Sequence, residues 1–176
     1  KQRHQMNSRL VIVNIVRWFI VLLSQILLLR NLNFYNLANP FIYILVLLLL
    51  PFSTPNLLLY LVAFITGLTM DAFYDTVGVH TAACVTLAFV RILFISVSVS
   101  RDNFDEPEPT LGNMGFKWFL LYATLCTFGH HIVLFFLETF KITEFSYTLV
   151  RCLLSSVFTL FLLLLIEFIF YSRKAR

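Results

Sequence analysis

The chain has 176 residues, of which 60% are hydrophobic and 12% are charged, whereas soluble domains are about 45–50% apolar and about 25% charged. One soluble core of this length does not bury so much apolar surface, which excludes an ordinary soluble domain and predicts a membrane protein. The net charge of +4 comes mainly from basic residues at the two chain ends. Without a basic helix face, this pattern excludes a nucleic-acid partner.

The first predicted element is a membrane-spanning helix over residues 10–29, because a span needs about 20 apolar residues. It follows a basic tail, residues 1–9. Within this tail we expect Met6 to be the true start and residues 1–5 to be upstream sequence. The tail is expected to lie in the cytoplasm, because positive residues beside spans stay on that side.

The next two apolar runs, residues 40–50 and 56–70, are short for full spans. Pro40 suits the first turn of a helix, and Pro51 and Pro55 bracket a tight turn between the runs. Two short spans are the preferred interpretation. A re-entrant hairpin over residues 40–70 stays open, since runs of about 10–14 residues also form such segments.

Further spans are predicted at residues 81–98, 116–137 and 145–171, with a polar, acidic loop over 100–115. The fold class is therefore an all-α, polytopic membrane bundle of about six short transmembrane segments, a single domain over residues 10–171. An even number of segments places both ends on one side. The basic tail of residues 172–176 assigns that side to the cytoplasm, which gives a multi-pass protein of the bacterial inner membrane.

Charged residues inside the predicted spans are costly and usually face a partner in the bundle. Arg17, Arg91 and Glu167 are each expected within roughly 10 Å of the cytoplasmic face, at about 1.5 Å per helical residue. The sequence therefore predicts that Glu167 pairs with Arg17 or Arg91. A structural ion pair is favoured over a polar track for protons, because residues near one face make no continuous relay.

Acids and histidines gather toward the opposite face. Asp71 and Asp75 are interpreted as acceptors that order a loop, rather than as a cation site. His130 and its neighbour His131 cannot both face one side of a helix, so we expect one to contact neighbouring helices and the other to face a groove. Two histidines lie one helical turn from a cysteine, at His80–Cys84 and Cys126–His130; buried packing is favoured over metal ligation. No catalytic motif is present, and the sequence predicts no enzyme and no cofactor.

One motif is more specific. Gly67 and Asp71 are followed by a short aromatic stretch, then by Gly78, His80 and a helix start rich in small residues. Gly67 permits close approach of a helix, Asp71 can cap the reversing loop, and Gly78 supplies a conformation open to few residues. This order and spacing, with the length and the basic ends, resemble MreD, the rod shape-determining membrane protein family of bacteria. The resemblance covers nearly the whole chain.

The resemblance implies a non-catalytic scaffold of the cell-elongation (Rod) complex, which regulates cell shape and peptidoglycan synthesis. Its implied partners are an MreC-like bitopic protein, a RodA-type glycosyltransferase with its transpeptidase, and cytoplasmic MreB filaments. The implied architecture is similar to the substrate-binding subunits of energy-coupling-factor vitamin importers. Such a capture subunit is the alternative function, although the first helix lacks the Ala-x-x-x-Ala pattern that docking to an energising subunit would require.

Binding would occur through helix packing in the bilayer, on small or polar positions. Ser96 with Ser100 and Thr124 with Thr127 are candidate surfaces, and internal packing is the competing interpretation of both pairs. The acidic segment 102–108 could reach basic partners, although a solvated loop is favoured. A homodimer, and a ligand in a cavity near Asp71 and His130, both stay open.

Overall fold

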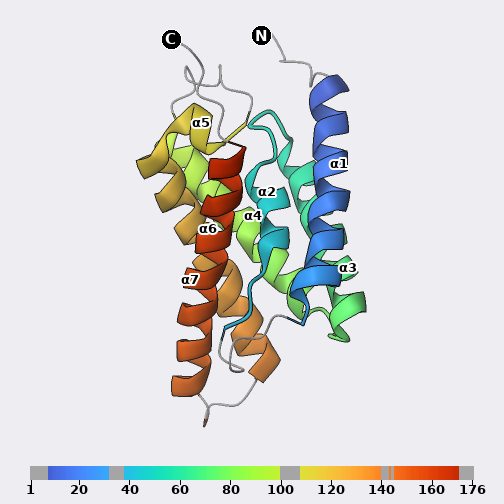
Figure 1. The fold of residues 1–176 in the computed structure, drawn as a ribbon, viewed down its shortest axis with the longest axis vertical. Coiled ribbons are helices and arrows are strands. Elements are labelled where there is room, and N and C mark those ends of the chain that lie inside the picture. Colours follow the sequence, from blue (N-terminus) through green and yellow to red (C-terminus); the bar gives the residue numbers. More distant parts are fainter. Residues whose placement is uncertain (1–7, 32–37, 100–107, 140–142, 144, 171–176) are drawn as a thin grey trace.

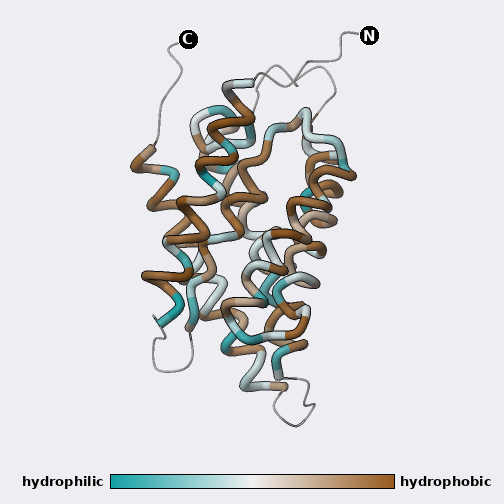
Figure 2. The backbone as a smooth tube through the Cα atoms, turned by 90° about the vertical axis from the view of Figure 1, so that its right-hand side faces the viewer, coloured by the Kyte–Doolittle hydropathy of each residue, from teal (hydrophilic) through white to brown (hydrophobic). Residues whose placement is uncertain are grey.

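The computed structural model describes residues 8–31, 38–99, 108–139, 143 and 145–170. Within this part of the chain the regular structure is helical (Figure 1). Five helical stretches are long and apolar enough to cross a membrane, which indicates a multi-pass membrane protein. Residues 1–7, 171–176 and the first half of the acidic loop, 100–107, fall outside the described residues. Hydrophobic residues make up most of the helical path (Figure 2).

The five long stretches agree with five of the predicted spans. The first comprises α1 (Ser8–Ser24) and a π-helical turn, η1 (Gln25–Leu29). The others are α3 (Asn56–Tyr74), α4 (Val79–Ser98), α6 (Phe116–Thr139) and α7 (Phe145–Ile169). A one-turn helix, α5 (Leu111–Met114), precedes α6 and is separated from it by Gly115, whose φ of 82° ends the first helix.

The prediction of a short membrane span over residues 40–50 is wrong, because these residues do not form one continuous helix. This part of the chain is a 3₁₀ turn, η2 (Ile42–Ile44), followed by one turn of α-helix, α2 (Leu45–Leu48). Residues 41–50 are at most 8% exposed, so they lie inside the bundle and not against lipid. The chain climbs through this segment from the lower end of α1 to the upper start of α3 (Figure 1). Because α3 is itself long enough to span, the structure does not show a re-entrant hairpin over residues 40–70.

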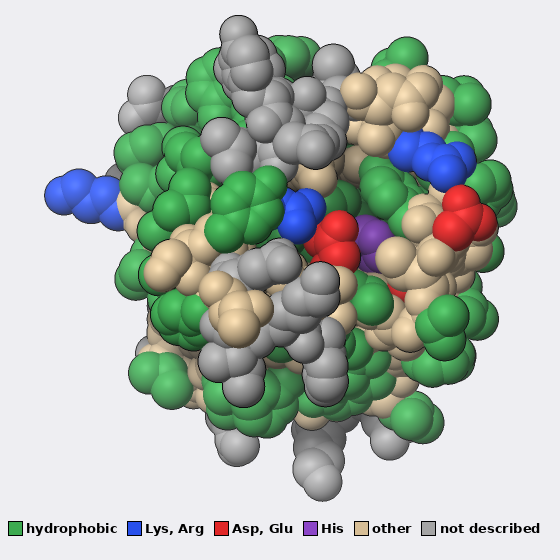
Figure 3. Space-filling model, turned by 90° about the horizontal axis from the view of Figure 1, so that it is seen from below, with side chains coloured by type: hydrophobic (Ala, Val, Ile, Leu, Met, Phe, Trp, Pro, Cys, Tyr) green, Lys and Arg blue, Asp and Glu red, His purple; other side chains and the backbone are tan. Residues whose placement is uncertain are grey.

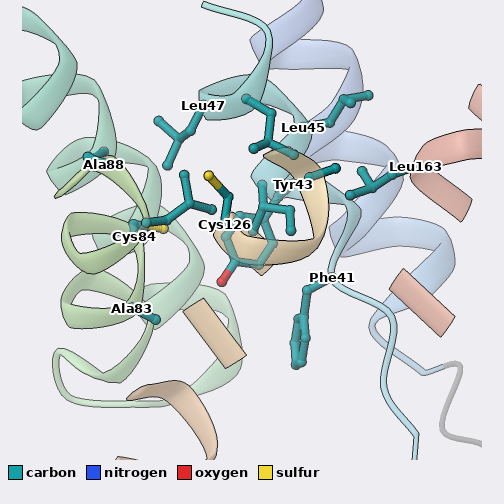
Figure 4. Packing of buried hydrophobic residues seen from close by; sticks show 14 of the residues in the cluster. Phe41, Tyr43, Leu45, Leu47, Ala83, Cys84, Ala88, Cys126 and Leu163 are labelled. Atoms are coloured by element: carbon teal, nitrogen blue, oxygen red, sulfur yellow. The ribbon is translucent and has the colours of Figure 1, made fainter. Parts of the chain in front are cut away.

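The helices pack around this buried segment. α4 lies between α3 and α6, and α6 also packs on α7, while α1 packs mainly on α2, η1 and η2. Figure 4 shows Cys84, Cys126 and Leu163 of the surrounding helices near Tyr43 and Leu45 of the segment. The start of α1 and the end of α7 lie at the same end of the bundle (Figure 1), because the buried segment returns the chain from the lower end of α1 to the upper start of α3.

Candidate functional site

The centre of the molecule is defined by the backbone of residues 39–51, here named the buried segment. Irregular backbone at membrane depth is tolerated only where protein groups satisfy its N–H and C=O groups, because hydrocarbon offers no hydrogen bonds. Neither a 3₁₀ turn nor a single α-helical turn satisfies the groups at its own ends. The buried segment therefore needs polar partners from the surrounding helices.

At the lower end of the buried segment these partners come from η1 and α7. The Gln25 amide donates to the Pro40 carbonyl at 3.0 Å and accepts from the Ile42 N–H at 2.8 Å. Thr159 and Ser155 of α7 accept from the N–H groups of residues 41 and 39, at 3.1 and 3.0 Å. The π-helical turn begins at Gln25, whose side chain is fully buried.

At the upper end the partners come from α4 and α6. Arg91, 3% exposed, donates to the Leu50 carbonyl, and it also donates to the Tyr122 hydroxyl at 3.0 Å. Tyr122 in turn donates to the Leu48 carbonyl at 2.8 Å. Cationic and hydroxyl donors thus bind the free carbonyls at the C-terminal end of α2, where the helix dipole is negative. Within the part of the chain that the structure describes, Arg91 binds backbone carbonyls and no carboxylate.

Between these two ends, a chain of buried aromatic side chains crosses the bundle. The Tyr43 hydroxyl lies 2.8 Å from Nδ1 of His80 and 2.8 Å from Nε2 of His130. Nδ1 of His130 lies 3.3 Å from Nδ1 of His131, whose other nitrogen lies 3.2 Å from the Thr159 hydroxyl. Tyr43, His130 and His131 are 0% exposed and His80 is 3% exposed.

The geometry of the neutral side chains fixes the direction of these hydrogen bonds. The Thr127 carbonyl only accepts, so Nδ1 of His131, 2.8 Å away, carries a proton. Nδ1 of His130 faces that protonated nitrogen and is therefore an acceptor. His130 then carries its proton on Nε2 and donates to Tyr43, which donates to Nδ1 of His80. The chain locks Tyr43, and with it the buried segment, against α4 and α6.

The histidine prediction is corrected by this arrangement. We expected one of His130 and His131 to face a groove, but both are fully buried, because Tyr43 and Thr159 offer hydrogen bonds on different sides of α6. Among the described residues, no group of three or more histidine, cysteine and acidic side chains is arranged to hold a metal ion. Cys84, Cys126 and Cys152 are free and buried.

The junction of α3 and α4 has the structure that the motif predicts. A Cβ atom on Gly67 would lie 2.7 Å from the Thr81 nitrogen and 2.8 Å from the His80 carbonyl oxygen, so only glycine allows this approach of the helices. Gly78 has a φ of 78°, in the left-handed region that favours glycine. Both glycines therefore have the roles that their residue type suggests.

Asp71 caps α4 from the neighbouring helix. Its Oδ1 accepts from the His80 N–H at 2.9 Å and from the Thr76 hydroxyl at 2.6 Å. Its Oδ2 accepts from the N–H and the hydroxyl of Thr81, at 3.0 and 2.6 Å. The predicted role as a loop-ordering acceptor is confirmed. Asp75 has a different place, since it ends α3 in the left-handed conformation and pairs with exposed Arg30 at 3.4 Å.

Glu167 has a partner other than the predicted arginines. Among the described residues, neither Arg17 nor Arg91 forms an ion pair with it, and its carboxylate accepts from the Leu111 N–H at the start of α5, at 2.8 Å. Arg17 pairs instead with Glu108, at 3.3 Å. The sequence assigns Glu108 to a solvated loop, but this residue is only 9% exposed and takes the place beside Arg17 that was expected for Glu167.

The candidate docking positions differ in their exposure. Ser96 is exposed on α4, where its hydroxyl donates to the Leu93 carbonyl at 2.8 Å, and Ser100 lies outside the described residues. Thr127 is 0% exposed, so Thr124 and Thr127 do not form a surface pair. Internal packing is the correct interpretation of Thr127.

Several central residues were missed from the sequence. Tyr43 lies in an unbroken apolar run that predicts only burial, and Tyr122 and Thr159 occur in ordinary span sequences. One available signal was Gln25, a polar residue deep in a predicted span, and the other was the shortness of the run after Pro40. Together they indicate a broken segment that needs a polar partner.

The lower end of the bundle carries the described ion pairs Arg30–Asp75 and Arg151–Glu138, each at 3.4 Å. Seen from this end, a histidine side chain is visible beside acidic and basic side chains (Figure 3).

Comparison of the chain with protein-family models, with curated proteins and with solved structures found no match.

Proposed function

We propose that the chain is a non-catalytic membrane scaffold of the bacterial cell-elongation complex. In this role it lies in the inner membrane, binds an MreC-like bitopic protein, and connects it to a RodA-type glycosyltransferase and its transpeptidase. The bundle supplies a rigid surface on which the single helix of a partner packs. Close packing and hydrogen bonds between helices drive this kind of association in lipid.

The observation that carries this proposal is the α3–α4 junction. The resemblance to MreD rests on Gly67, Asp71, Gly78 and His80. Each of these residues has a specific task in the structure. Gly67 seats α4 against α3, Gly78 begins α4, Asp71 caps it, and His80 binds Tyr43 at 2.8 Å. A motif whose residues all act in one junction is better support for family membership than scattered matches to an apolar sequence.

A second observation favours a scaffold over an enzyme. The polar side chains at the centre bind the buried segment or one another, as Gln25, Arg91 and Tyr122 do. They satisfy backbone groups that the membrane cannot satisfy, which is a structural task. The arrangement gives a stiff bundle, and a stiff bundle suits a protein that positions other membrane helices.

The test is purification of the protein from gently solubilised native membranes, with a tag at its C-terminus, followed by identification of its partners. Recovery of an MreC-like protein with a RodA-type glycosyltransferase supports the scaffold. Recovery of a transmembrane energising subunit with paired ATPases instead assigns the chain to a vitamin importer and contradicts the proposal.

Two matched variants locate the partner surface. Ser96 on α4 and Thr69 on α3 both have a hydroxyl that bonds a carbonyl of its own helix, each at 2.8 Å; Ser96 is exposed and Thr69 is partly exposed. If the partner packs on α4, Ser96→Phe reduces recovery of the MreC-like protein about tenfold. This corresponds to a loss of roughly 1.4 kcal/mol in binding free energy. Thr69→Phe leaves recovery unchanged. Equal recovery with both variants assigns the partner to another face.

A further inference from the structure

We propose that the protein responds to acid at the lower end of the bundle: a proton that binds His80 breaks its hydrogen bond with Tyr43 and loosens the buried segment from α4. The side chains involved are Tyr43, His80, His130 and His131, here named the histidine network. This property is independent of the proposed scaffold function.

His80 is the member of the histidine network that a proton can reach. It lies in the first turn of α4, which begins at the lower end of the bundle (Figure 1). His80 is 3% exposed, whereas the other three members are 0% exposed. A histidine side chain is visible at the surface of this end, beside acidic and basic side chains (Figure 3). On the orientation that the basic tails predict, this end faces away from the cytoplasm, so the proton comes from the non-cytoplasmic side.

The hydrogen bonds of the histidine network require one proton on each ring. Nδ1 of His131 donates to the Thr127 carbonyl at 2.8 Å. Nε2 of His130 donates to the Tyr43 hydroxyl at 2.8 Å, and this hydroxyl donates to Nδ1 of His80, also at 2.8 Å. Nδ1 of His80 is therefore the unprotonated nitrogen of its ring. A second proton on His80 turns this acceptor into a donor.

Rearrangement within the histidine network does not accommodate the extra proton. When both nitrogens of His80 carry protons, the Tyr43 hydroxyl has N–H donors on two sides, and its own proton loses its acceptor. If His130 reverses its hydrogen bonds, its Nδ1 becomes a donor and faces Nδ1 of His131, 3.3 Å away. That nitrogen then has to lose its proton, and it becomes an acceptor 2.8 Å from the Thr127 carbonyl. Each arrangement leaves a buried polar group unpaired, which is costly. The conflict is relieved when His80 separates from Tyr43 and water takes its place.

The charged groups beside His80 make it the histidine that takes the proton. On α3, the Asp71 carboxylate accepts from the backbone N–H of His80 at 2.9 Å, and its negative charge favours a cation on this ring. The Tyr74 ring lies 4.9 Å from the His80 ring, and the Arg30 guanidinium lies 5.8 Å from the Tyr74 ring. Arg30 is itself paired with Asp75, which reduces its repulsion of a proton on His80.

The remaining elements present neutral groups to the histidine network. Cys84 lies one turn after His80 on α4, and α7 contributes the Thr159 hydroxyl. Arg151 of α7 lies over the Phe135 ring and is paired with Glu138. Within the described residues, no carboxylate bonds a ring of His130 or His131. A fully buried ring without such a partner is a poor site for a charge.

The test is hydrogen exchange of the unaltered protein in detergent, measured by mass spectrometry. Exchange is compared at about pH 7.5 and about pH 5, on either side of the ordinary histidine pKa of about 6.5. Protection factors of the amides in residues 41–50 are expected to fall about tenfold at the lower pH, because the buried segment loses its attachment to α4. Unchanged protection of these amides overturns the proposal, and so does a loss of equal size throughout the bundle.

Two matched variants separate His80 from the rest of the histidine network. The side-chain oxygen of asparagine takes nearly the position of Nδ1 of histidine, so His80→Asn still accepts from Tyr43 but binds no proton. This variant is expected to abolish the acid response. The amide nitrogen of glutamine takes nearly the position of Nε2, so His130→Gln still donates to Tyr43 and retains the response. A response that persists in His80→Asn, or disappears in His130→Gln, overturns the proposal.

A second measurement leaves the histidine network unaltered. The variant His4→Gln removes the one histidine outside the described residues, so three rings remain. Their nitrogens are followed by NMR in the same detergent after labelling with ¹⁵N-histidine. One ring is expected to take up a proton at the pH where the protection of residues 41–50 falls, while two rings stay neutral. Loss of protection with all three rings neutral overturns the proposal, as does simultaneous protonation of two or more rings.

Discussion

Asp71 holds the first turn of α4 through both carboxylate oxygens. We expect Asp71→Asn to destabilise the protein by about 1–3 kcal/mol, because the new NH₂ group faces donors and leaves them unpaired. Thermal unfolding in detergent measures the effect. Asp75→Asn is the control, since its exposed pair with Arg30 contributes about 0–1 kcal/mol at most. An equal loss from both variants would show that the cap is not specific.

Arg17 and Glu108 make a second prediction at this scale. Their side chains are only 21% and 12% exposed and lie 3.3 Å apart, so their contributions to stability are expected to be coupled. A double-mutant cycle of Arg17→Gln and Glu108→Gln should give an interaction energy of about 0.5–3 kcal/mol. The same cycle with Glu167→Gln in place of Glu108→Gln should give less. A larger coupling to Glu167 would restore the pairing that the sequence suggested.

Individual residues were predictable where one physical requirement acts on one side chain. Gly67 and Gly78 follow from steric limits, and the capping role of Asp71 follows from its place at a helix end. The pairing of Glu167 was not predictable in this way. Depth in the bilayer fixes the height of a charge but not its azimuth around the bundle, and the choice between Glu108 and Glu167 depends on that angle.

At the scale of elements, the contact between α3 and α4 depends on the absence of a side chain. Gly67→Ala is expected to force the helices apart, because backbone atoms of Thr81 and His80 lie in the way, and overpacking typically costs about 1–3 kcal/mol. Gly129→Ala on α6 is the matched control. Its Cβ would meet the Val90 side chain at 3.0 Å, which can shift. The melting temperature of Gly67→Ala should be clearly lower than that of Gly129→Ala, and the reverse order would contradict the packing argument.

The five long helical stretches were predictable because about 20 apolar residues in a row have few other structures in a membrane. The buried segment was not, because an apolar run of its length suits a short span, a re-entrant turn or a core helix equally well. The conformation of the buried segment depends on polar atoms elsewhere in the chain. Gln25, Arg91 and Thr159 supply the hydrogen bonds that a broken helix needs, and sequence distance hides their convergence.

For the whole molecule, the turn between α3 and α4 and the start of α6 lie at opposite ends of the bundle (Figure 1). Val77→Cys, at a position that is 99% exposed, and Lys117→Cys should therefore react with a membrane-impermeant maleimide from opposite sides. The positive-inside rule predicts basic ends in the cytoplasm, and on this prediction Val77→Cys is labelled in intact cells and Lys117→Cys only after permeabilisation. The native cysteines are buried and give little background. Labelling of both from one side would contradict the topology.

The buried segment also constrains how the protein is made. The segment leaves the ribosome early, yet acceptors for its N–H groups, Ser155 and Thr159, belong to the last helix. Its native, broken conformation therefore cannot be fully hydrogen-bonded before α7 is made. The segment completes its native hydrogen bonds only when α7 is in place, so we expect it to reach its final position late in assembly. Chains that stop before α7 lack both acceptors, and we expect them to be degraded faster than the full chain in pulse-chase measurements.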